Sequence, residues 1–267
     1  MREYLSFFKI RFSIGLQYRA AAWAGMATQF AWGGMTILLF RAFYQSSQNA
    51  LPMTMSELSS YIWLQQAFLA LYMVWYFDND IFGSIMSGNI AYELCRPIDI
   101  YAMWFTKNMA VRISRAVLRC LPILVFAAFL PAPYNISLPI SPAAGLLFII
   151  SMILGLLVVV AFSMIIYVSA FYTISPIGIR ILATSVLEFF TGAIIPLPFF
   201  PQSLQTLMYL LPFASMQSTP FMIYNGYISG ERIASAISLQ IIWLIILLAL
   251  GKTLMVRALR KVVVQGG

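Results

Sequence analysis

The sequence predicts an all-α polytopic membrane protein, and three observations carry this prediction. Hydrophobic residues make up 62% of the 267 residues and charged residues only 9%, whereas an ordinary soluble domain has about 25% charged residues. The mean hydropathy is +0.89. Apolar runs long enough to cross a bilayer recur along the chain. We therefore expect one transmembrane domain over residues 1–267, without a separate soluble catalytic domain.

Six runs of roughly 20 mostly apolar residues predict six transmembrane helices. They cover residues 21–44, 58–77, 107–130, 143–171, 181–199 and 233–256.

The first 20 residues mix aromatic and aliphatic side chains with Arg2, Lys9, Arg11 and Arg19. This pattern predicts a basic amphipathic helix over residues 1–20 that lies on the membrane surface. A simple positively charged flank of the first span is the alternative. The stretch is too basic and too interrupted to be a cleaved signal peptide, so it is expected to remain in the mature protein.

The positive charges predict the orientation of the chain. With the N-terminus in the cytoplasm, all but two of the 16 Lys and Arg residues fall on the inner side, and only Arg41 and Arg232 lie outside. Such a bias predicts that both termini are cytoplasmic and that the number of spans is even. The expected location is the cytoplasmic (inner) membrane of a prokaryote. Topology and anionic lipid explain the net charge of +8 without nucleic-acid binding.

Several kinds of chemical site are excluded by the residues present. The chain has no His, and Cys95 and Cys120 do not form a metal or redox spacing. No metal or cofactor is therefore expected in this chain. The triplet 251–253 reads Gly-Lys-Thr, but Ile246 stands where a phosphate-binding loop needs its first glycine. We interpret the triplet as a coincidence at the inner end of the last span.

The segment 81–97 follows the second span on the predicted cytoplasmic side. Apolar residues recur in it at helical spacing, and a proline then disfavours helix at the residue before it. We expect one short helix, which either docks another protein or forms a loop with no partner. The apolar residues are Phe82, Ile85, Met86, Ile90 and Leu94, and the proline is Pro97.

Two blocks of the sequence resemble the permease subunits of type-2 ATP-binding-cassette (ABC) exporters. The first is the pattern Gly88, Leu94 and Arg96-Pro97 after the second span. The second is the stretch 191–212, where a glycine precedes a proline-rich exit and a proline ends the short helix that follows. The residues at matching positions of the second block are Gly192, Pro196, Pro201, Leu204 and Pro212.

The resemblance implies that the segment 81–97 is a coupling helix that seats in a cytoplasmic ATPase subunit. It also implies two such ATPase subunits and a second permease subunit, identical or homologous to this chain. ATP and Mg would bind in the ATPase partner, and this chain would hydrolyse nothing. The implied contact residues are Phe82, Ile85, Met86, Gly88, Ile90, Glu93, Leu94, Arg96 and Pro97.

Glu188 is the one acid well inside a predicted span, and it shares a helix face with Thr184, Thr191 and Gly192. A carboxylate inside a membrane is costly and usually faces a cavity or a partner. Glu188 is therefore expected to line the translocation path or to pair with a cation of the third span. Packing against another helix, such as one of the second permease copy, is the alternative, and a lipid-facing position is the least favoured.

The second span carries an aromatic stripe on one face, and all of its residues except Trp75 complete the candidate translocation path. Together with Glu188, aromatic walls would suit a flat, apolar or cationic molecule. Aromatic residues also form ordinary belts at the membrane interface, which is the other explanation. The stripe consists of Tyr61, Gln65, Phe68, Tyr72 and Trp75.

The third span contains Arg112, Arg115 and Arg119, which share one helix face. Such arginines either extend to the inner interface or line a water-filled vestibule. We interpret them as residues that extend to the inner interface.

The stretch 200–220 is apolar but interrupted by prolines, and its halves are too short to cross a bilayer. It predicts re-entrant or interfacial helices at the outer mouth, and a static hydrophobic plug is the alternative. In the family that the chain resembles, this region acts as an outer gate. The implied gate residues are Pro196, Pro201, Leu204 and Pro212.

The sequence is therefore interpreted as the permease subunit of an ATP-driven exporter. The substrate class is hydrophobic or amphipathic, as in drug-like molecules, lipids or glycans. An ion-coupled secondary transporter is one alternative, but it would need a relay of several intramembrane acids. A lipid-modifying enzyme is the other, and the acids Asp78, Asp80, Glu93 and Asp99 lack a metal-binding spacing for it.

Overall fold

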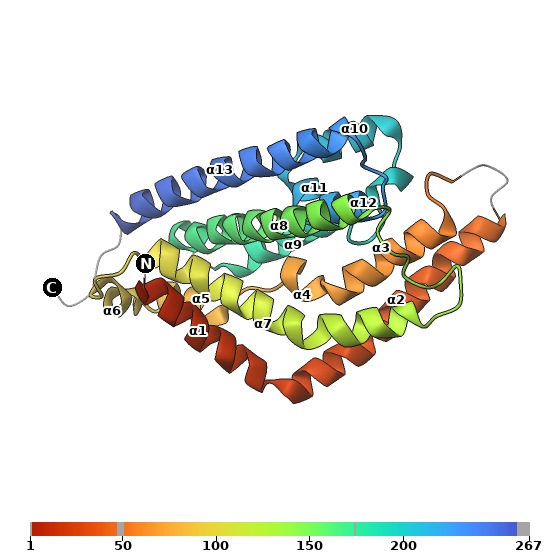
Figure 1. Cartoon of the computed structure of the whole chain (residues 1–267). Helices are drawn as coiled ribbons and strands as arrows, with labels where there is room; N and C mark the ends of the chain where they lie inside the picture. Colours follow the sequence, from red (N-terminus) through yellow and green to blue (C-terminus); the bar gives the residue numbers. More distant parts are fainter. Residues whose placement is uncertain (1, 47–50, 174, 261–267) are drawn as a thin grey trace.

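The computed structural model describes residues 2–46, 51–173 and 175–260, and these residues form helices and no strand. Four long helices have their axes roughly along the long axis of the molecule (Figure 1). They are α2 (Arg19–Ser46), α7 (Ile100–Ala128), α8 (Pro142–Ser169) and α13 (Glu231–Leu259). One end of the bundle holds the start of α1 (Arg2–Gln17), α5 (Asn79–Met86), α6 (Ile90–Leu94) and the last turn of α13. We call this the α6 end.

Shorter elements fill the bundle between the long helices. In chain order they are α3 (Met55–Ala67), α4 (Leu69–Tyr72), the 3₁₀ turn η1 (Ala170–Tyr172), α9 (Ile177–Phe190), the 3₁₀ turn η2 (Leu197–Phe199), α10 (Gln202–Leu210), α11 (Pro212–Met216) and α12 (Ser218–Tyr224). The all-helical class is as predicted, but some of the six expected spans are broken or end earlier than expected.

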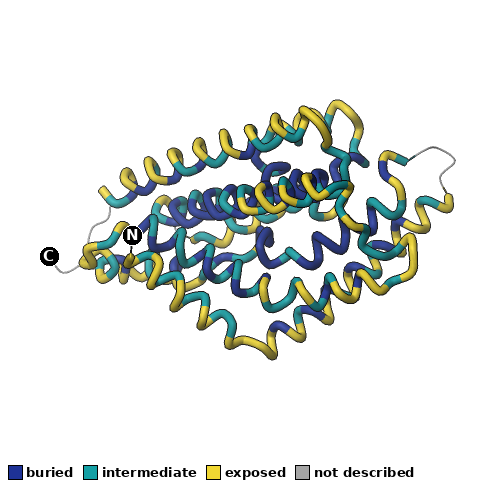
Figure 2. The backbone as a smooth tube through the Cα atoms, viewed as in Figure 1, coloured by how far each residue is buried: buried dark blue, intermediate teal, exposed yellow. Residues whose placement is uncertain are grey.

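Among the residues that the structure describes, two helical stretches are long and apolar enough to cross a membrane by length and composition, Pro142–Tyr172 and Glu231–Leu259. Over an 18-residue window their mean hydropathy reaches 2.9 and 2.5, respectively. The first contains α8, which lies at the centre of the bundle and is buried along most of its length (Figure 2). The second is α13, which buries few residues and turns most of its surface outward (Figure 2). α4, α7, α9, α11, α12 and α13 pack on α8, whereas α1, α2 and α3 pack mainly on α7 and on one another.

The predicted second span, 58–77, is not a continuous helix. α3 ends at Ala67, α4 adds one turn, and the chain leaves the helical conformation after Tyr72. Since a helix rises about 1.5 Å per residue, α3 alone is shorter than the roughly 30 Å hydrocarbon core. The prediction of an unbroken span was wrong, because side chains of other helices hold the backbone carbonyls released at the break.

The chief of those side chains is Arg112 of α7, which is fully buried. Its Nη1 donates to the carbonyl oxygens of Leu71 and Met73 at 2.9 and 2.8 Å, and its Nε donates to Asn108 Oδ1 at 2.6 Å. Its Nη2 donates to Ser163 Oγ of α8 at 3.4 Å. Arg112 thus binds the freed end of α4, where the carbonyl dipoles favour a positive charge. We call this group the Arg112 clamp.

The three arginines of α7 therefore have different environments, and the interpretation that all three extend to the inner interface was wrong for Arg112. Arg115 lies over the ring of Tyr76, 4.3 Å from its centroid. Arg119 donates to the carbonyl oxygen of Ala21, near the junction of α1 and α2, at 3.3 Å. Spacing placed these residues on one broad helix face, but the break after α4 draws the first of them into the core.

The predicted fifth span, 181–199, also ends early. α9 stops at Phe190, and Gly192 follows with a φ of +75°. This left-handed conformation is one that glycine adopts without a steric penalty. The chain then turns through Ala193–Ile195 into the 3₁₀ turn η2. With 14 residues, α9 is shorter than the hydrocarbon core at about 1.5 Å per residue.

The third span begins at Ile100 rather than at residue 107, because Asp99 caps the helix. The Asp99 carboxylate accepts hydrogen bonds from the backbone N–H groups of Tyr101 and Ala102 at 3.1 and 3.4 Å. Such a side chain satisfies N–H groups that a helix start leaves without partners. α7 therefore reaches beyond the apolar run and connects the α6 end to the middle of the bundle.

Residues 2–17 are helical as expected, and α1 packs along the first half of α7. The hydroxyl of Tyr4 accepts a hydrogen bond from the Asp99 N–H at 3.1 Å. Gly15 faces Ser114 so closely that an added Cβ would overlap the serine side chain. A bend at Tyr18 then separates α1 from α2, and the two helices form a V (Figure 1). The placement of α1 on a membrane surface stays a prediction.

The segment 81–97 forms two short helices instead of the single helix expected. α5 ends at Met86, Gly88 turns the chain with a φ of +76°, and α6 runs from Ile90 to Leu94. Helical spacing alone misses the turn, because Ile90 resumes the apolar pattern after it. Ile81 and Phe82 of α5 and Ile90 of α6 are nevertheless buried in one hydrophobic cluster.

Residues 200–220 form α10, α11 and the start of α12. α11 contacts α8 and α13 through a buried polar group. Gln240 of α13 donates to the carbonyls of Ser215 and Ser151 at 2.8 and 3.1 Å and accepts from Ser151 Oγ at 2.9 Å. Gly155, one turn along α8 from Ser151, lies directly against the backbone of Met216. The position of this stretch at an outer mouth stays a prediction.

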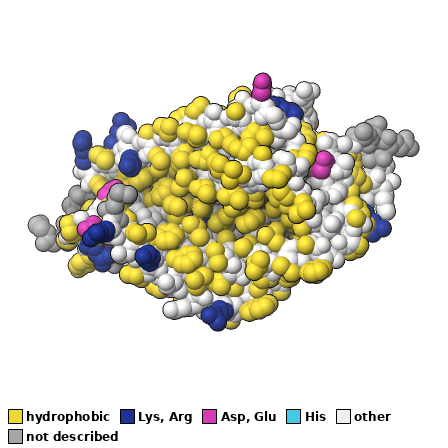
Figure 3. Space-filling view, in the orientation of Figure 1, with side chains coloured by type: hydrophobic (Ala, Val, Ile, Leu, Met, Phe, Trp, Pro, Cys, Tyr) yellow, Lys and Arg dark blue, Asp and Glu magenta, His cyan; other side chains and the backbone are white. Residues whose placement is uncertain are grey.

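Charged side chains gather at the two ends of the molecule, and the surface between them is mostly hydrophobic (Figure 3). Lys and Arg side chains are most frequent at the α6 end (Figure 3). There Lys107 Nζ lies 2.7 Å from a carboxylate oxygen of Asp78 and 3.3 Å from one of Asp80. This distribution is the one expected of a protein whose middle lies in hydrocarbon.

Candidate functional site

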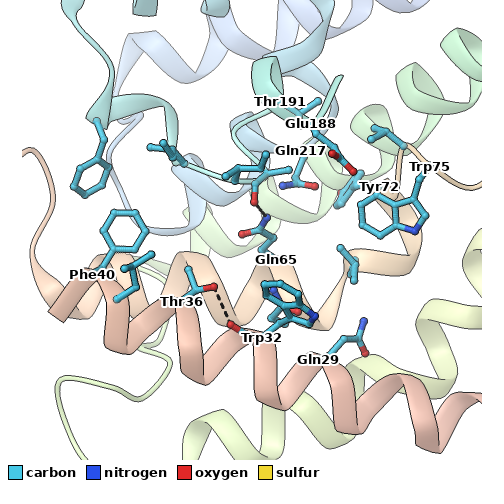
Figure 4. Close-up of a pocket in the computed structure, with 18 of the residues that line it drawn as sticks. Gln29, Trp32, Thr36, Phe40, Gln65, Tyr72, Trp75, Glu188, Thr191 and Gln217 are labelled. Carbon is cyan, nitrogen blue, oxygen red and sulfur yellow. Dashed lines mark hydrogen bonds between the residues drawn. The ribbon is translucent and has the colours of Figure 1, made fainter. Parts of the chain in front are cut away.

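A cavity of ≈ 940 Å³ lies between α2, the broken second span and the end of α9 (Figure 4). Its volume is near the upper end of the range of about 300–1,000 Å³ that is typical of ligand pockets. One wall is a face of the regular helix α2, and the other two walls are formed where the helices α4 and α9 end.

The α2 wall consists of one face of that helix. Gln29, Trp32, Thr36 and Phe43 line the cavity at steps of three, four and seven residues, so they point in one direction. Trp32 is 63% exposed and stands at an open side of the cavity. None of the residues of this wall was predicted from the sequence. The available signal was the placement of Gln29 and Thr36 on one face of an otherwise apolar span.

The second wall comes from α3, α4 and the residues just after the break. Gln65 and Gln66 face the cavity from α3, and Tyr72 and Trp75 face it from the two sides of the break. The Gln65 amide N–H donates to the carbonyl of Ala193, which connects this wall to the next one (Figure 4). The Tyr72 hydroxyl donates to the Met152 carbonyl at 3.0 Å and fixes the ring.

The third wall is formed by the end of α9 and the turn that follows. Glu188, Thr191 and the turn residues Ala193–Ile195 line the cavity. The Tyr61 hydroxyl donates to the Gly192 carbonyl at 3.1 Å, and an added Cβ at Gly192 would come within 3.0 Å of that hydroxyl. The glycine turn is therefore held from behind, and this holds Thr191 toward the cavity.

Glu188 is the one charged side chain among the described residues that line the cavity. Apart from it, the polar groups of the lining are amides, hydroxyls and the ring N–H groups of two tryptophans, and most of the surface is aromatic or aliphatic. Such a lining suits an amphipathic molecule and gives no positive charge to an anion. Glu188 faces the cavity, which favours the path-lining role over packing, but its role stays a prediction.

The structure brings together half of the predicted path residues. Gln65, Tyr72, Glu188 and Thr191 line the cavity. The other four support it or lie elsewhere. Tyr61 and Gly192 form the bonded layer behind its wall, Phe68 packs toward Phe148, and Thr184 lines a neighbouring pocket of ≈ 370 Å³ together with Trp75.

The predicted gate residues belong to the turns around η2 and α10 rather than to the lining of the cavity. Pro196 and Pro212 are buried, Leu204 is half-buried, and Pro201 is exposed. Pro212 starts α11. At the ends of this region, Phe199 and Gln217 line the cavity instead. A gating role of the prolines stays a prediction.

The predicted ATPase contact residues divide into a buried and an exposed group. Phe82 and Ile90 are buried in the core of this chain, so they cannot form a surface contact themselves, and the Glu93 carboxylate accepts from Trp104 Nε1 at 2.9 Å. Ile85 is half-buried. The exposed members are Met86, Gly88, Leu94, Arg96 and Pro97.

Tyr92 adds to the exposed group and was missed by the sequence analysis. It is 75% exposed, Leu94 is 41% exposed, and Met86 is 47% exposed. Met86, Tyr92 and Leu94 are thus three large apolar side chains exposed at the α6 end. The helices that carry them, α5 and α6, are anchored in the core by Phe82 and Ile90. We call Met86, Tyr92, Leu94, Arg96 and Pro97 the coupling surface.

A family model described as "ABC-2 family transporter protein" matches residues 30–266. No curated protein matches the chain. The matched residues include the coupling surface, the second and third walls of the cavity, and the α2 wall except Thr28 and Gln29.

Proposed function

The chain belongs to the ABC-2 family of transporter proteins, whose members are membrane components served by an ATP-binding partner, and from this premise we propose that it is the permease subunit of an exporter. In this proposal it moves a hydrophobic or amphipathic molecule out across the cytoplasmic membrane of a prokaryote. ATP and Mg bind to two cytoplasmic ATPase subunits. The observation that carries the proposal is the amphipathic cavity, one wall of which is connected to the coupling surface by a short segment of the chain.

That connection is short. Trp75 lines the cavity, and α5 begins at Asn79. Between them, Phe77 packs on Tyr167 and Phe82, and the backbone N–H of Asp78 donates to the Tyr167 hydroxyl at 2.7 Å. A displacement of α5 and α6 by an ATPase subunit would therefore move the wall that holds Trp75. This is the route that we propose for the energy of ATP hydrolysis.

The charge distribution supports a cytoplasmic position for the α6 end. Lys and Arg side chains gather there (Figure 3), and positively charged residues favour the cytoplasmic side and anionic lipid. Both termini are then cytoplasmic, and the turns around α10 are on the outer side. An ATPase subunit in the cytoplasm would reach the coupling surface without crossing the membrane.

A second permease subunit, identical or homologous, is proposed to cover the open side of the cavity. Trp32 of α2 and Ile194 after α9 line the cavity and are exposed by 63% and 61%. Between these apolar edges lie Gln29 and Glu188. Hydrocarbon would leave such groups without hydrogen bonds, whereas a second protein surface can enclose the cavity and keep it accessible to substrate.

The function is tested at the coupling surface. Leu94→Asp and Tyr92→Asp each place a charge where an apolar anchor would be buried in the ATPase subunit. Loss of such an anchor costs about 2 kcal/mol or more, which is roughly a 30-fold loss of affinity. We expect the wild-type protein, purified from native membranes, to retain an ATP-binding subunit and both variants to lose it at matched expression.

Asn89→Ser is the matched control, since Asn89 is exposed in the same turn but offers no apolar anchor. Ile90→Asp is not a suitable variant, because Ile90 is 1% exposed and the charge would disrupt the core. If the wild type retains no ATP-binding subunit, the proposed function is wrong. If it does and both variants retain it equally well, the coupling surface lies elsewhere.

A further inference from the structure

Three buried polar side chains of the cavity wall each carry at least one atom that makes no hydrogen bond. Gln29 is 2% exposed, and both of its amide atoms lack a partner. Thr191 is 1% exposed, and its hydroxyl lacks a partner. Gln217 is 3% exposed, and its amide nitrogen lacks a partner. More than about 90% of buried polar groups in proteins are hydrogen-bonded, and each unpaired group costs about 1–3 kcal/mol. Three in one cavity need an explanation.

These three groups come from separate parts of the chain and converge on the same space (Figure 4). Gln29 belongs to α2, Thr191 follows the last residue of α9, and Gln217 lies between α11 and α12. Other hydroxyls of the same lining are already satisfied. Thr36 donates to the Trp32 carbonyl at 2.8 Å, and Thr28 donates to the Gly25 carbonyl at 2.8 Å. The unpaired groups are thus a subset of the polar lining.

We propose that the cavity binds an uncharged amphipathic molecule whose polar part carries several hydroxyl groups. Gln29, Thr191 and Gln217 hold the hydroxyls, and the aromatic lining holds the apolar part. This inference rests on the proposed function, because it names the class of substrate that the permease would take from the membrane.

The hydrogen-bonding types of the three groups select hydroxyls. An amide offers N–H donors and a carbonyl acceptor, and a threonine hydroxyl both donates and accepts. A ligand hydroxyl also does both, so a polyhydroxyl head group can satisfy the set. A phosphate offers only acceptors at neutral pH, and a quaternary ammonium group offers no hydrogen bond at all.

The charge of the lining leads to the same choice. No Lys or Arg occurs among the described lining residues, and Glu188 is present. An anionic head group would therefore be desolvated beside a carboxylate without a counter-charge, which is strongly unfavourable. The Glu188 carboxylate can accept a hydrogen bond from a hydroxyl.

The apolar part of the ligand is expected to lie against the rings of α2 and of the broken second span. Trp32, Phe40, Phe43 and Trp75 line this side. Because Trp32 stands at the open side of the cavity, an alkyl chain longer than the cavity can extend past it. The shape therefore suits a polar head with a single chain attached.

The test uses three amphiphiles that share an octyl chain and differ in the head group: octyl glucoside, octyl phosphate and octyltrimethylammonium. Full-length protein in lipid nanodiscs is dialysed to equilibrium against each labelled amphiphile below its micelle concentration, with protein-free nanodiscs as the background. We expect saturable binding of octyl glucoside at least about tenfold tighter than of the other two, a difference of about 1.4 kcal/mol. Equal or tighter binding of either charged amphiphile, or no saturable binding of octyl glucoside, overturns the inference.

Two threonines give a matched pair of variants. Thr191→Val removes an unpaired hydroxyl and is expected to weaken glucoside binding about fivefold or more. Thr206→Val removes a hydroxyl of α10 that lies outside the cavity and donates to the Gln202 carbonyl at 3.0 Å, so it should change binding less than about twofold. Gln29→Leu should also weaken binding. Unchanged binding in Thr191→Val and Gln29→Leu contradicts the assignment.

Thermal stability without ligand separates ligand binding from a structural role. Gln29→Leu replaces a buried group that lacks partners, so the ligand-free variant is expected to melt at the same or a higher temperature while its glucoside binding falls. A lower melting temperature together with the loss of binding would show that Gln29 supports the fold and overturn the assignment. Because no ATPase takes part, these results are independent of the coupling-surface test.

Discussion

Replacing Arg112 with methionine is expected to prevent accumulation of the folded protein. The substitution removes the donors to Asn108 Oδ1 and to the carbonyls of Leu71 and Met73. Each buried acceptor without a partner costs about 1–3 kcal/mol, so three of them cost at least about 3 kcal/mol out of a typical total stability of about 5–15 kcal/mol. A fluorescent fusion is extracted in mild detergent, and size-exclusion chromatography then measures the fraction that is monodisperse.

Arg115→Met is the matched control, because it removes the same side chain one turn away. Arg115 lies over the Tyr76 ring and is only half-buried, so its loss should cost about 0.5–1 kcal/mol. Arg112→Lys should be nearly as harmful as Arg112→Met, since an ammonium group cannot reproduce the planar fork of donors. A normal yield and melting temperature in Arg112→Met would show that the broken span does not depend on the clamp.

Gly155→Leu is expected to have the second-largest effect on stability. A Cβ at this position would overlap the carbonyl oxygen of Met216 and crowd that of Ser215. Both atoms belong to the backbone, so a side-chain rotation cannot relieve the contact. Overpacking a close contact typically costs 1–3 kcal/mol and occasionally more, and α11 would also be displaced from Gln240. We expect a large drop in the melting temperature of the detergent-solubilised protein.

Gly178→Leu tests whether the effect is due to the contact or to the glycine. Gly178 is exposed in α9, and an added Cβ there has nothing within 4 Å. Leucine favours helix over glycine by up to about 1 kcal/mol, so this variant should melt at the same or a higher temperature. If Gly155→Leu and Gly178→Leu behave alike, the close approach of α8 and α11 is not important for stability.

Hydrophobic periodicity predicted the long helices well and failed where tertiary hydrogen bonds decide the backbone. Residues 58–77 are mostly apolar and contain no Gly or Pro, so nothing local in them indicates a break. The break depends on Arg112 and Ser163, which are distant in sequence. The early end of α9 had a visible local cause in Gly192, but only the structure shows that Tyr61 holds the turn.

The candidate site was half predictable for a similar reason. The carboxylate of Glu188 and the polar face of α9 stand out in an apolar span, whereas the unpaired state of the Gln29 and Gln217 amides is visible only in the structure. An amide that is hydrogen-bonded and one that is not have the same sequence signature. Likewise, the apolar spacing of Phe82 and Ile90 indicated a buried face but not what buries it. In the structure Phe77 and Tyr167 of this chain pack on Phe82, so part of that face is covered from within the chain.

The Arg112 clamp also has a consequence for biogenesis. The chain is synthesised from its N-terminus, so the carbonyls of Leu71 and Met73 are in the membrane before Arg112, whereas Ser163 follows later. An arginine at the centre of an inserting helix costs about 2.5–3.5 kcal/mol. α4 can neutralise much of this cost at once, and α8 completes the group afterwards. The physically cheapest order therefore inserts α3, α4 and α7 as one unit, which α8 then joins.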